Sequence, residues 1–276
     1  MTLQMNQEEI SIIKGVRFHN FSEYAVCHIE DFSDDLKDRL RNQLSYICFG
    51  ASKAESSRKA YSYKRTLIEF LNRYDSKTSD TQMGMIGELL THILISSYFP
   101  ELSAVSPYFN MEEKSIKKGF DVILYSRGNQ ELWITEVKSG ELHKGKSANE
   151  TLLDLLGTAK RDLQKRLNEN ELTLWENAIN GAYVALENKK DVKDAVLEIL
   201  YEVEDSVAEE RADSKNKNVI LVASLFSHLS DKIQANEVKK YYNRMTRKKS
   251  FGNVIVLSFQ KNTYQKVVDF LKLEAQ

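Results

Sequence analysis

The sequence is poor in the residues that build cross-linked, looped or membrane-embedded folds. It has only two cysteines, Cys27 and Cys48, in apolar surroundings and without metal-ligand spacing, which excludes a disulfide framework and indicates buried thiols in a reducing compartment. Its only prolines are Pro100 and Pro107, so no proline-rich linker divides the chain. No apolar run approaches membrane-spanning length, and the first residues lack a secretory pattern. We therefore expect a cytoplasmic protein with no membrane partner.

An excess of charge of one sign is also missing, but the charges are unevenly placed. The net charge of −1 argues against a protein that coats nucleic acid by charge alone. Residues 187–213 hold ten acidic and four basic side chains, a balance of −6, whereas residues 235–250 hold six basic and one acidic, a balance of +5. This segregation indicates one surface for a polyanion and another for water or a protein partner.

Hydrophobic patterns and capping residues indicate that helices and strands alternate, which favours an α/β fold with a mixed sheet flanked by helices. We expect residues 1–78 to form a mainly helical N-terminal extension and residues 79–276 to form the sheet-containing domain. Strands are expected at residues 24–29, 218–226 and 254–259. Helices are expected at residues 33–48, 52–74, 81–98, 148–168, 172–179, 192–210, 235–249 and 264–273.

What is present is a hairpin pattern at residues 119–138. Two β-rich runs flank Gly128-Asn129, a dipeptide that favours a tight turn. If this pair is the centre of the turn, Asp121 lies opposite Glu136, and Lys138 shares their face of the sheet. Adjacent carboxylates repel unless a cation lies between them, and hard divalent cations prefer carboxylate oxygen. The hairpin predicts a divalent-metal site, against the alternative of a solvent-facing hairpin edge.

This arrangement resembles the PD-(D/E)XK nuclease superfamily, in which an Asp on one strand and Glu-x-Lys on the next hold magnesium beside the scissile phosphate. Here the match is Asp121 with Glu136-Val137-Lys138, and Phe120 stands where a proline is common. The resemblance implies a restriction-endonuclease-like sheet and metal-dependent hydrolysis of DNA. Asp121 and Glu136 would bind Mg²⁺ or Mn²⁺ with the carbonyl of Val137. Lys138 would orient water or stabilise charge on the phosphate.

Glu88 is a further candidate for this site. The helix expected around it is apolar on nearly all sides, and such a helix is buried. A carboxylate there is costly unless a charge or hydrogen-bond donors meet it. One interpretation is a structural partner such as an arginine. The other is a metal or metal-bound water, and the superfamily resemblance implies that second role for an upstream helical Glu.

Over most of its length the chain also resembles the HamA-type nuclease subunit of the Hachiman anti-phage defence system. The resemblance rests on Gly87-Glu88, Gly119-Phe120-Asp121 and residues 133–138, in that order and at about that spacing. It implies a dedicated helicase partner that restrains the nuclease until foreign or damaged DNA appears. A nuclease-like module that only docks a helicase or DNA stays open as an alternative.

Two basic regions are candidates for contact with nucleic acid. Tyr241 and Tyr242 lie within the second basic stretch, residues 239–249. The six cations predicted to contact nucleic acid are Lys144, Lys146, Lys160, Arg244, Arg247 and Lys248. A solvated amphipathic helix is the alternative for residues 235–249.

The first region overlaps residues 140–147, which match the P-loop pattern between a strand and a helix. A P-loop strand is central and parallel, whereas this strand is the second arm of a hairpin. No later strand ends in an Asp suited to magnesium. A P-loop nucleotidase is therefore kept only as a weaker alternative.

Overall fold

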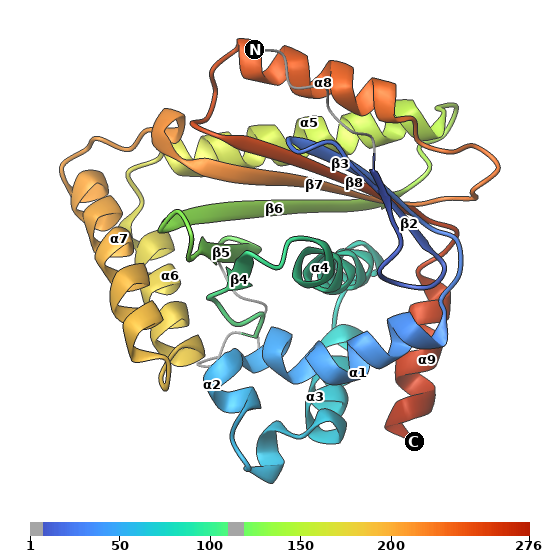
Figure 1. Cartoon of the computed structure of the whole chain (residues 1–276), viewed down its shortest axis with the longest axis horizontal. Coiled ribbons are helices and arrows are strands. Elements are labelled where there is room, and N and C mark those ends of the chain that lie inside the picture. The colour runs from blue at the N-terminus through green and yellow to red at the C-terminus, as the bar shows by residue number, and fades with distance from the viewer. Residues whose placement is uncertain (1–7, 110–118) are drawn as a thin grey trace.

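The computed structural model describes residues 8–109 and 119–276, and these form one curled mixed sheet with helices on both faces (Figure 1). The expected α/β class is confirmed. Eight strands are found in the described residues, in the order β1-β2-β3-β8-β7-β6-β5-β4. The four central strands β3, β8, β7 and β6 run parallel, and the pairs at both edges are antiparallel. The strands are β1 (Glu8–Ile10), β2 (Val16–Asn20), β3 (Tyr24–Ile29), β4 (Leu102–Ala104), β5 (Val122–Ser126), β6 (Glu131–Glu141), β7 (Asn218–Phe226) and β8 (Val254–Lys261).

The helices pack on the two faces of this sheet and enclose two hydrophobic cores (Figure 1). One core lies against α1, α3, α4 and α9, and the other against α5, α6, α7 and α8. None of the described helices combines the length and apolar character that crossing a bilayer requires. The helices are α1 (Asp34–Phe49), α2 (Ala51–Ala54), α3 (Tyr63–Asp75), α4 (Ser79–Tyr98), α5 (Ala148–Asn168), α6 (Leu172–Ala185), α7 (Lys190–Ala208), α8 (Ala235–Arg247) and α9 (Gln265–Ala275).

The hairpin of β5 and β6 has the expected register. Val122 pairs with Thr135, and Leu124 pairs with Trp133. Residues 127–130 form the turn, and its left-handed residue is Gln130 (φ 55°) rather than either member of the Gly-Asn pair. β6 also pairs in parallel with β7. The second arm of the hairpin, β6, is thus also a central parallel strand, which the sequence analysis did not expect. Strand position therefore does not exclude a P-loop, and the contacts of residues 140–147 decide.

The N-terminal region is not the mainly helical extension that the sequence predicts. Residues 8–29 contribute three strands, and β3 pairs in parallel with β8 from the far end of the chain. The helices that follow share a core with the later part of the chain, in which Leu40 and Leu67 lie with Leu90 and Leu257. Strands β1 and β2 escaped notice because they are short, and only their place in the sheet stabilises them.

Local capping signals set two helix starts correctly. The hydroxyl of Ser33 accepts from Leu36 N–H at the start of α1, and Ser147 forms a capping box with Glu150 at the start of α5. The single helix expected at residues 52–74 is instead broken. The hydroxyl of Ser56 donates to Lys53 O at 2.7 Å, and such serine bonds compete with the backbone bonds of a helix.

Gly87 brings α4 against the centre of the sheet, next to Glu88. A Cβ at Gly87 would overlap Ser139 Oγ and lie 3.1 Å from Ser224 Oγ, whereas a Cβ at Gly84 would meet nothing within 4 Å. We predict that Gly87→Ala destabilises the fold by about 1–3 kcal/mol through overpacking. Gly84→Ala on the same helix should be neutral or stabilising by up to about 1 kcal/mol. Urea unfolding measures both, and equal effects would show that α4 does not approach the sheet this closely.

Candidate active site

Glu136 lies in the middle of β6 and is almost fully buried, with 1% of its surface exposed. Asp121 comes directly before β5, and its carboxylate accepts a hydrogen bond of 2.7 Å from the N–H of Val137. Asp121 is thereby held beside the strand that carries Glu136 and Lys138. The structure places these predicted residues together, as the hairpin register requires.

The two carboxylate oxygens of Glu136 are each paired with a cation. Lys138 Nζ lies 2.8 Å from Glu136 Oε1 and 2.9 Å from Asp162 Oδ2. Arg166 pairs with Glu136 Oε2 and donates to the carbonyl oxygen of Gly119 at 2.9 Å. The result is a chain of alternating charges in the order Asp162, Lys138, Glu136, Arg166.

Helix and strand periodicity explain this chain of charges. Residues i and i+2 of a strand share a face, so Glu136 and Lys138 both face α5. Residues i and i+4 of a helix also share a face, so Asp162 and Arg166 both face β6. A buried carboxylate without a partner would cost several kcal/mol, so Glu136 depends on cations that α5 and β6 supply together.

Burial and mutual repulsion raise the pKa of two carboxyl groups here. Burial, followed by the charge of Glu136, raises the pKa of Asp121 from 3.8 to about 7. Burial, followed by the charges of Asp121 and Glu136, raises the pKa of Glu88 well above its ordinary value. Burial lowers the pKa of Lys138, but its ion pairs with Glu136 and Asp162 outweigh this and leave that pKa raised. Burial and the neighbouring carboxylates therefore favour the neutral forms of Asp121 and Glu88, and a bound cation would favour their charged forms.

The donor chemistry fits a divalent cation, because Glu88, Asp121 and Glu136 are carboxylates that repel one another. Their arrangement is not yet that of a ligand set. Within residues 8–109 and 119–276, no group of three His, Cys, Asp or Glu side chains is placed to hold a metal. Glu88 lies on α4, which packs on the opposite face of the sheet from α5. Both carboxylate oxygens of Glu136 are already paired, one with Lys138 and the other with Arg166.

Glu88 lies within the electrostatic reach of the other charged groups of the site. Among the described residues no ion pair reaches its carboxylate, but the charges of Lys138 and Arg166 act to lower its pKa against the effect of burial. Burial raises the pKa of Glu88 most, and the charges of Asp121 and Glu136 raise it further. A metal or metal-bound water shared with these two groups stays a prediction.

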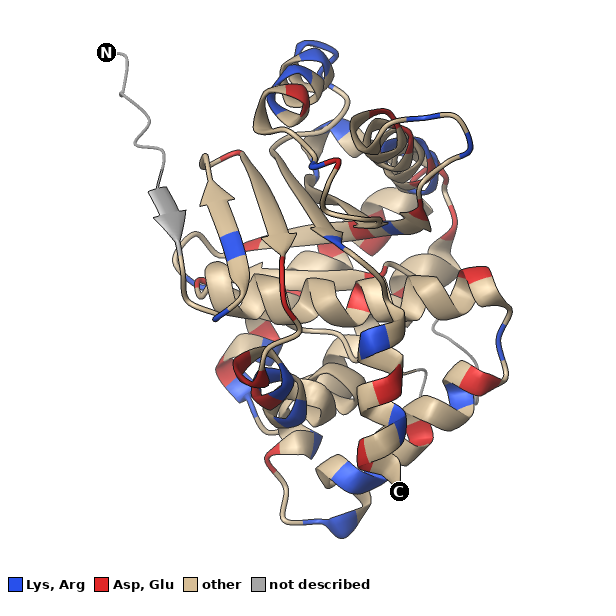
Figure 2. Cartoon of the chain, turned by 90° about the vertical axis from the view of Figure 1, so that its right-hand side faces the viewer, with Lys and Arg blue, Asp and Glu red and all other residues tan. Residues whose placement is uncertain are grey.

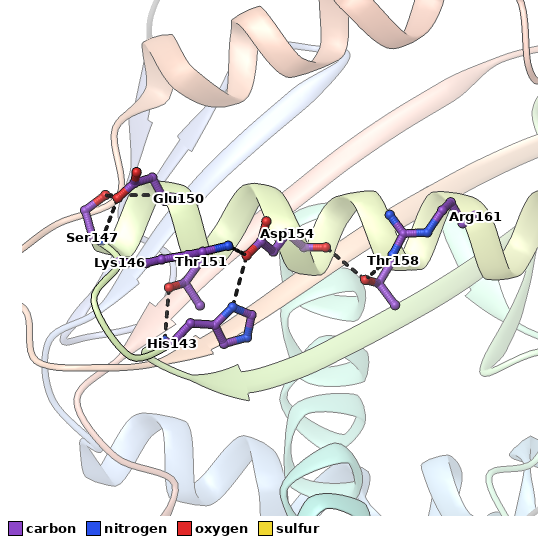
Figure 3. Close-up of polar contacts among 8 residues, drawn as sticks. All are labelled: His143, Lys146, Ser147, Glu150, Thr151, Asp154, Thr158 and Arg161. Carbon is purple, nitrogen blue, oxygen red and sulfur yellow. Dashed lines mark hydrogen bonds and ion pairs between the residues drawn. The ribbon is translucent and has the colours of Figure 1, made fainter.

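The loop at residues 140–147 is engaged with its own helix (Figure 3). Lys146 pairs with Asp154 Oδ2, and His143 Nδ1 lies 3.0 Å from the same oxygen. The Ser147 hydroxyl and N–H are bonded to Glu150, at 2.7 and 2.8 Å. Asp231 accepts from Ala148 N–H at 2.7 Å. Carboxylates thus pair with the lysine and accept hydrogen bonds from the helix N-terminus, the two groups that would bind phosphate in a P-loop.

Sequence reasoning missed the roles of Asp162 and Arg166. On the same helix Lys165 lies 3.6 Å from Glu169, an ordinary i, i+4 pair that does not reach the site. The available signal was the opposite charges at i and i+4 on the helix that follows Glu136-Val137-Lys138. The contact between α5 and β6 needed the tertiary fold.

The predicted nucleic-acid-binding residues fall into two groups. Lys160, Arg244, Arg247 and Lys248 line one groove of about 490 Å³ between α5 and α8. Lys144 lies on the exposed loop before α5, and Lys146 is neutralised by Asp154. Figure 2 shows mostly blue positions on α8, at the top of the molecule.

We predict that, without divalent metal, the free energy of unfolding falls as pH rises from about 4 to about 7. Folding raises the pKa of Asp121 to about 7, so the folded chain keeps a proton that the unfolded chain has lost. This contribution is complete below the ordinary pKa and is lost as pH rises through the folded pKa. Urea unfolding in chelator at stepped pH tests the sign. Asp121→Asn should flatten the dependence, and an unchanged slope in this variant would contradict the assignment.

Comparison with known proteins bears on the whole chain. The HamA family model matches residues 5–273, which is nearly the full sequence. No curated protein matches the chain. Because the family match includes the hairpin, α4 and α5, it covers every residue of the candidate site. The chain belongs to the HamA family.

Proposed function

We propose that this chain is a metal-dependent nuclease that hydrolyses phosphodiester bonds in DNA. HamA membership makes it an anti-phage defence protein of the Hachiman type. The observation that supports the nuclease activity is the cluster at β6, where Glu136 is buried beside Asp121 and Lys138. Such a concentration of charge in the middle of a sheet is costly, and perturbed pKa values of this kind cluster at functional sites.

The roles of the side chains follow from their positions. Asp121 and Glu136 would hold Mg²⁺ or Mn²⁺, with Glu88 and the carbonyl of Val137 completing the ligands. The bound ion would polarise the phosphate and lower the pKa of attacking water. Lys138 holds its charge because its pKa is raised, so it can orient that water and stabilise negative charge on the phosphate. The Val137 N–H keeps Asp121 in place beside the strand.

A non-catalytic module that docks a helicase or DNA is the second candidate. One observation favours it: Glu136 is satisfied by Lys138 and Arg166 without any metal. The P-loop nucleotidase has no comparable support, because Lys146 and Ser147 are bound to carboxylates. A helicase partner subunit is part of the proposal in both cases, since family membership suggests partners in a defence system.

We predict that conservative changes at the centre abolish metal-dependent cleavage. Asp121→Asn, Glu136→Gln and Lys138→Met should each lower the rate of plasmid nicking at least about 100-fold, the usual loss when one stabilising group is removed. The amide variants keep the side-chain shape, but Glu136→Gln leaves Lys138 and Arg166 only one acceptor oxygen, so the folding of each variant is checked first. Glu141→Gln, at the exposed end of the same strand, serves as the control.

The assay is run with Mg²⁺ and with Mn²⁺, on the chain alone and with its helicase partner, after thermal melting has shown that each variant is folded. Nicking by folded Glu136→Gln at the wild-type rate would rule out the proposed centre. Helicase binding without nicking by the wild-type chain would favour the docking module.

We propose that DNA lies along the groove between α5 and α8. Arg244, Arg247 and Lys248 project from the end of α8 toward Lys160 of α5, and within the described residues none of these four has an ion pair. Lys160 donates only to Gln164, at 2.8 Å. Burial, and then the nearby charge of Lys248, lower the pKa of Lys160. Cations that converge without a carboxylate favour an anionic ligand such as a phosphate backbone.

We predict that replacing Arg244, Arg247 and Lys248 together by Ala weakens binding equally across DNA sequences. The slope of log affinity against log salt should fall by about one for each phosphate that the protein no longer neutralises, that is by up to about three. The matched control replaces three cations on the same stretch, Lys239, Lys240 and Lys249, and removes the same charge outside the groove.

Binding is measured in chelator on DNA duplexes of different sequence, so that cleavage does not interfere. Equal effects of the two triple variants would show that only net charge matters. An unchanged slope with loss of helicase binding would make the groove a protein-docking surface.

A further inference from the structure

We propose that Arg166 is a reversible lock on this centre: its guanidinium holds the Glu136 oxygen that a divalent cation would need. Arg166 and the metal then compete for Glu136. The inference rests on the proposed metal site, but it concerns a residue that neither the hairpin motif nor the family match singles out. It explains why the carboxylates are gathered by the fold without forming a ligand set among the described residues.

Two anchors hold Arg166 in its position. It pairs with Glu136 Oε2 and donates to Gly119 O at 2.9 Å, next to the hairpin arm that carries Asp121. The first anchor crosses from α5 to β6 and the second from α5 to the segment before β5. Arg166 therefore contacts both β6, which carries Glu136, and the segment that leads from Gly119 through Asp121 into β5.

Glu136 cannot pair with Arg166 and with a divalent ion at the same time. Lys138 takes Oε1 and Arg166 takes Oε2, so the carboxylate is already matched by two positive charges. A divalent ion brought to the same oxygens would meet repulsion from the guanidinium. Arg166 is the cation of α5 that pairs with Glu136. Its displacement would free Oε2 for a metal ion, while Lys138 would stay paired with Asp162.

The exchange is energetically feasible because one cation replaces another. A buried carboxylate that loses its only partner costs about 3–5 kcal/mol, but Glu136 would keep a cation in either state. The Arg166 side chain is 26% exposed, so the guanidinium can leave toward solvent without a second desolvation cost. A phosphate oxygen pair suits its fork of donors, so a DNA backbone at the site would favour the released state.

The decisive test measures metal affinity in the absence of DNA, so it does not depend on cleavage. Mn²⁺ binding is followed by the electron paramagnetic resonance signal of the free ion, and by the Mn²⁺-dependent rise of the melting temperature. The variants are Arg166→Gln, which removes the charge, and Arg166→Lys, which keeps it. Arg161→Gln is the matched control, because Arg161 lies on the same helix and contacts Thr158 rather than the site (Figure 3).

If Arg166 is a lock, Arg166→Gln binds Mn²⁺ at least about fivefold more tightly than wild type, the lower end of common coupling between two ligands. Arg166→Lys should stay close to wild type, and Arg161→Gln should match it. In chelator Arg166→Gln should melt at a lower temperature, since Glu136 has lost a partner, and Mn²⁺ should restore it. Asp121→Asn should abolish the tightening.

The possible failures point to different parts of the proposal. Wild-type Mn²⁺ binding that depends on Asp121, with equal or weaker affinity in Arg166→Gln, overturns the lock and leaves the metal site standing. Absence of Asp121-dependent Mn²⁺ binding in both proteins overturns the lock and the metal site together. If Arg166→Gln does not fold, the wild-type chain decides: crystals soaked with Mn²⁺ should show the Arg166 guanidinium moved off Glu136, and a guanidinium still paired with Glu136 beside bound manganese contradicts the lock.

Discussion

The buried carboxylate of Glu136 is the interaction on which the centre of this molecule depends. It lies in the middle of a central strand with 1% of its surface exposed, where an unpaired charge would be strongly destabilising. The fold meets that cost by placing Lys138 two residues along the strand and Arg166 on the helix above it. The packing of α5 on β6 is therefore fixed by charge as well as by its apolar face.

The same requirement connects stability to function. A carboxylate that must have a cation can take it from an arginine or from a metal ion, and the rest of the site makes that choice matter. Burial, and then the neighbouring carboxylates, raise the pKa values of Asp121 and Glu88, so a cation bound beside them would favour their charged forms. In the proposed scheme Arg166 pairs with Glu136 until a metal ion replaces it. That exchange would keep the proposed nuclease centre inactive until the metal is bound.

Local rules predicted the hairpin register, and with it the neighbourhood of Asp121, Glu136 and Lys138. They also found β7 and β8, because strands buried on both faces read as continuous apolar runs. Contacts between distant elements could not be predicted in this way. Strands β1 and β2 are too short to be specified without their pairing in the sheet, and Arg166 and Asp162 look like ordinary surface charges until α5 packs against β6. Periodicity assigns a residue to a face but does not say what that face meets.

The most direct test of the central claim is anomalous diffraction from crystals of the chain grown or soaked with Mn²⁺. The account predicts one manganese peak between the carboxylates of Asp121 and Glu136, with the Arg166 guanidinium moved off Glu136. A peak at this position with Arg166 still in place would remove the competition but keep the metal centre. If wild-type crystals bind manganese elsewhere while Glu136 stays paired with Arg166 and Lys138, the carboxylates are a structural ion-pair network and the proposed nuclease centre is wrong.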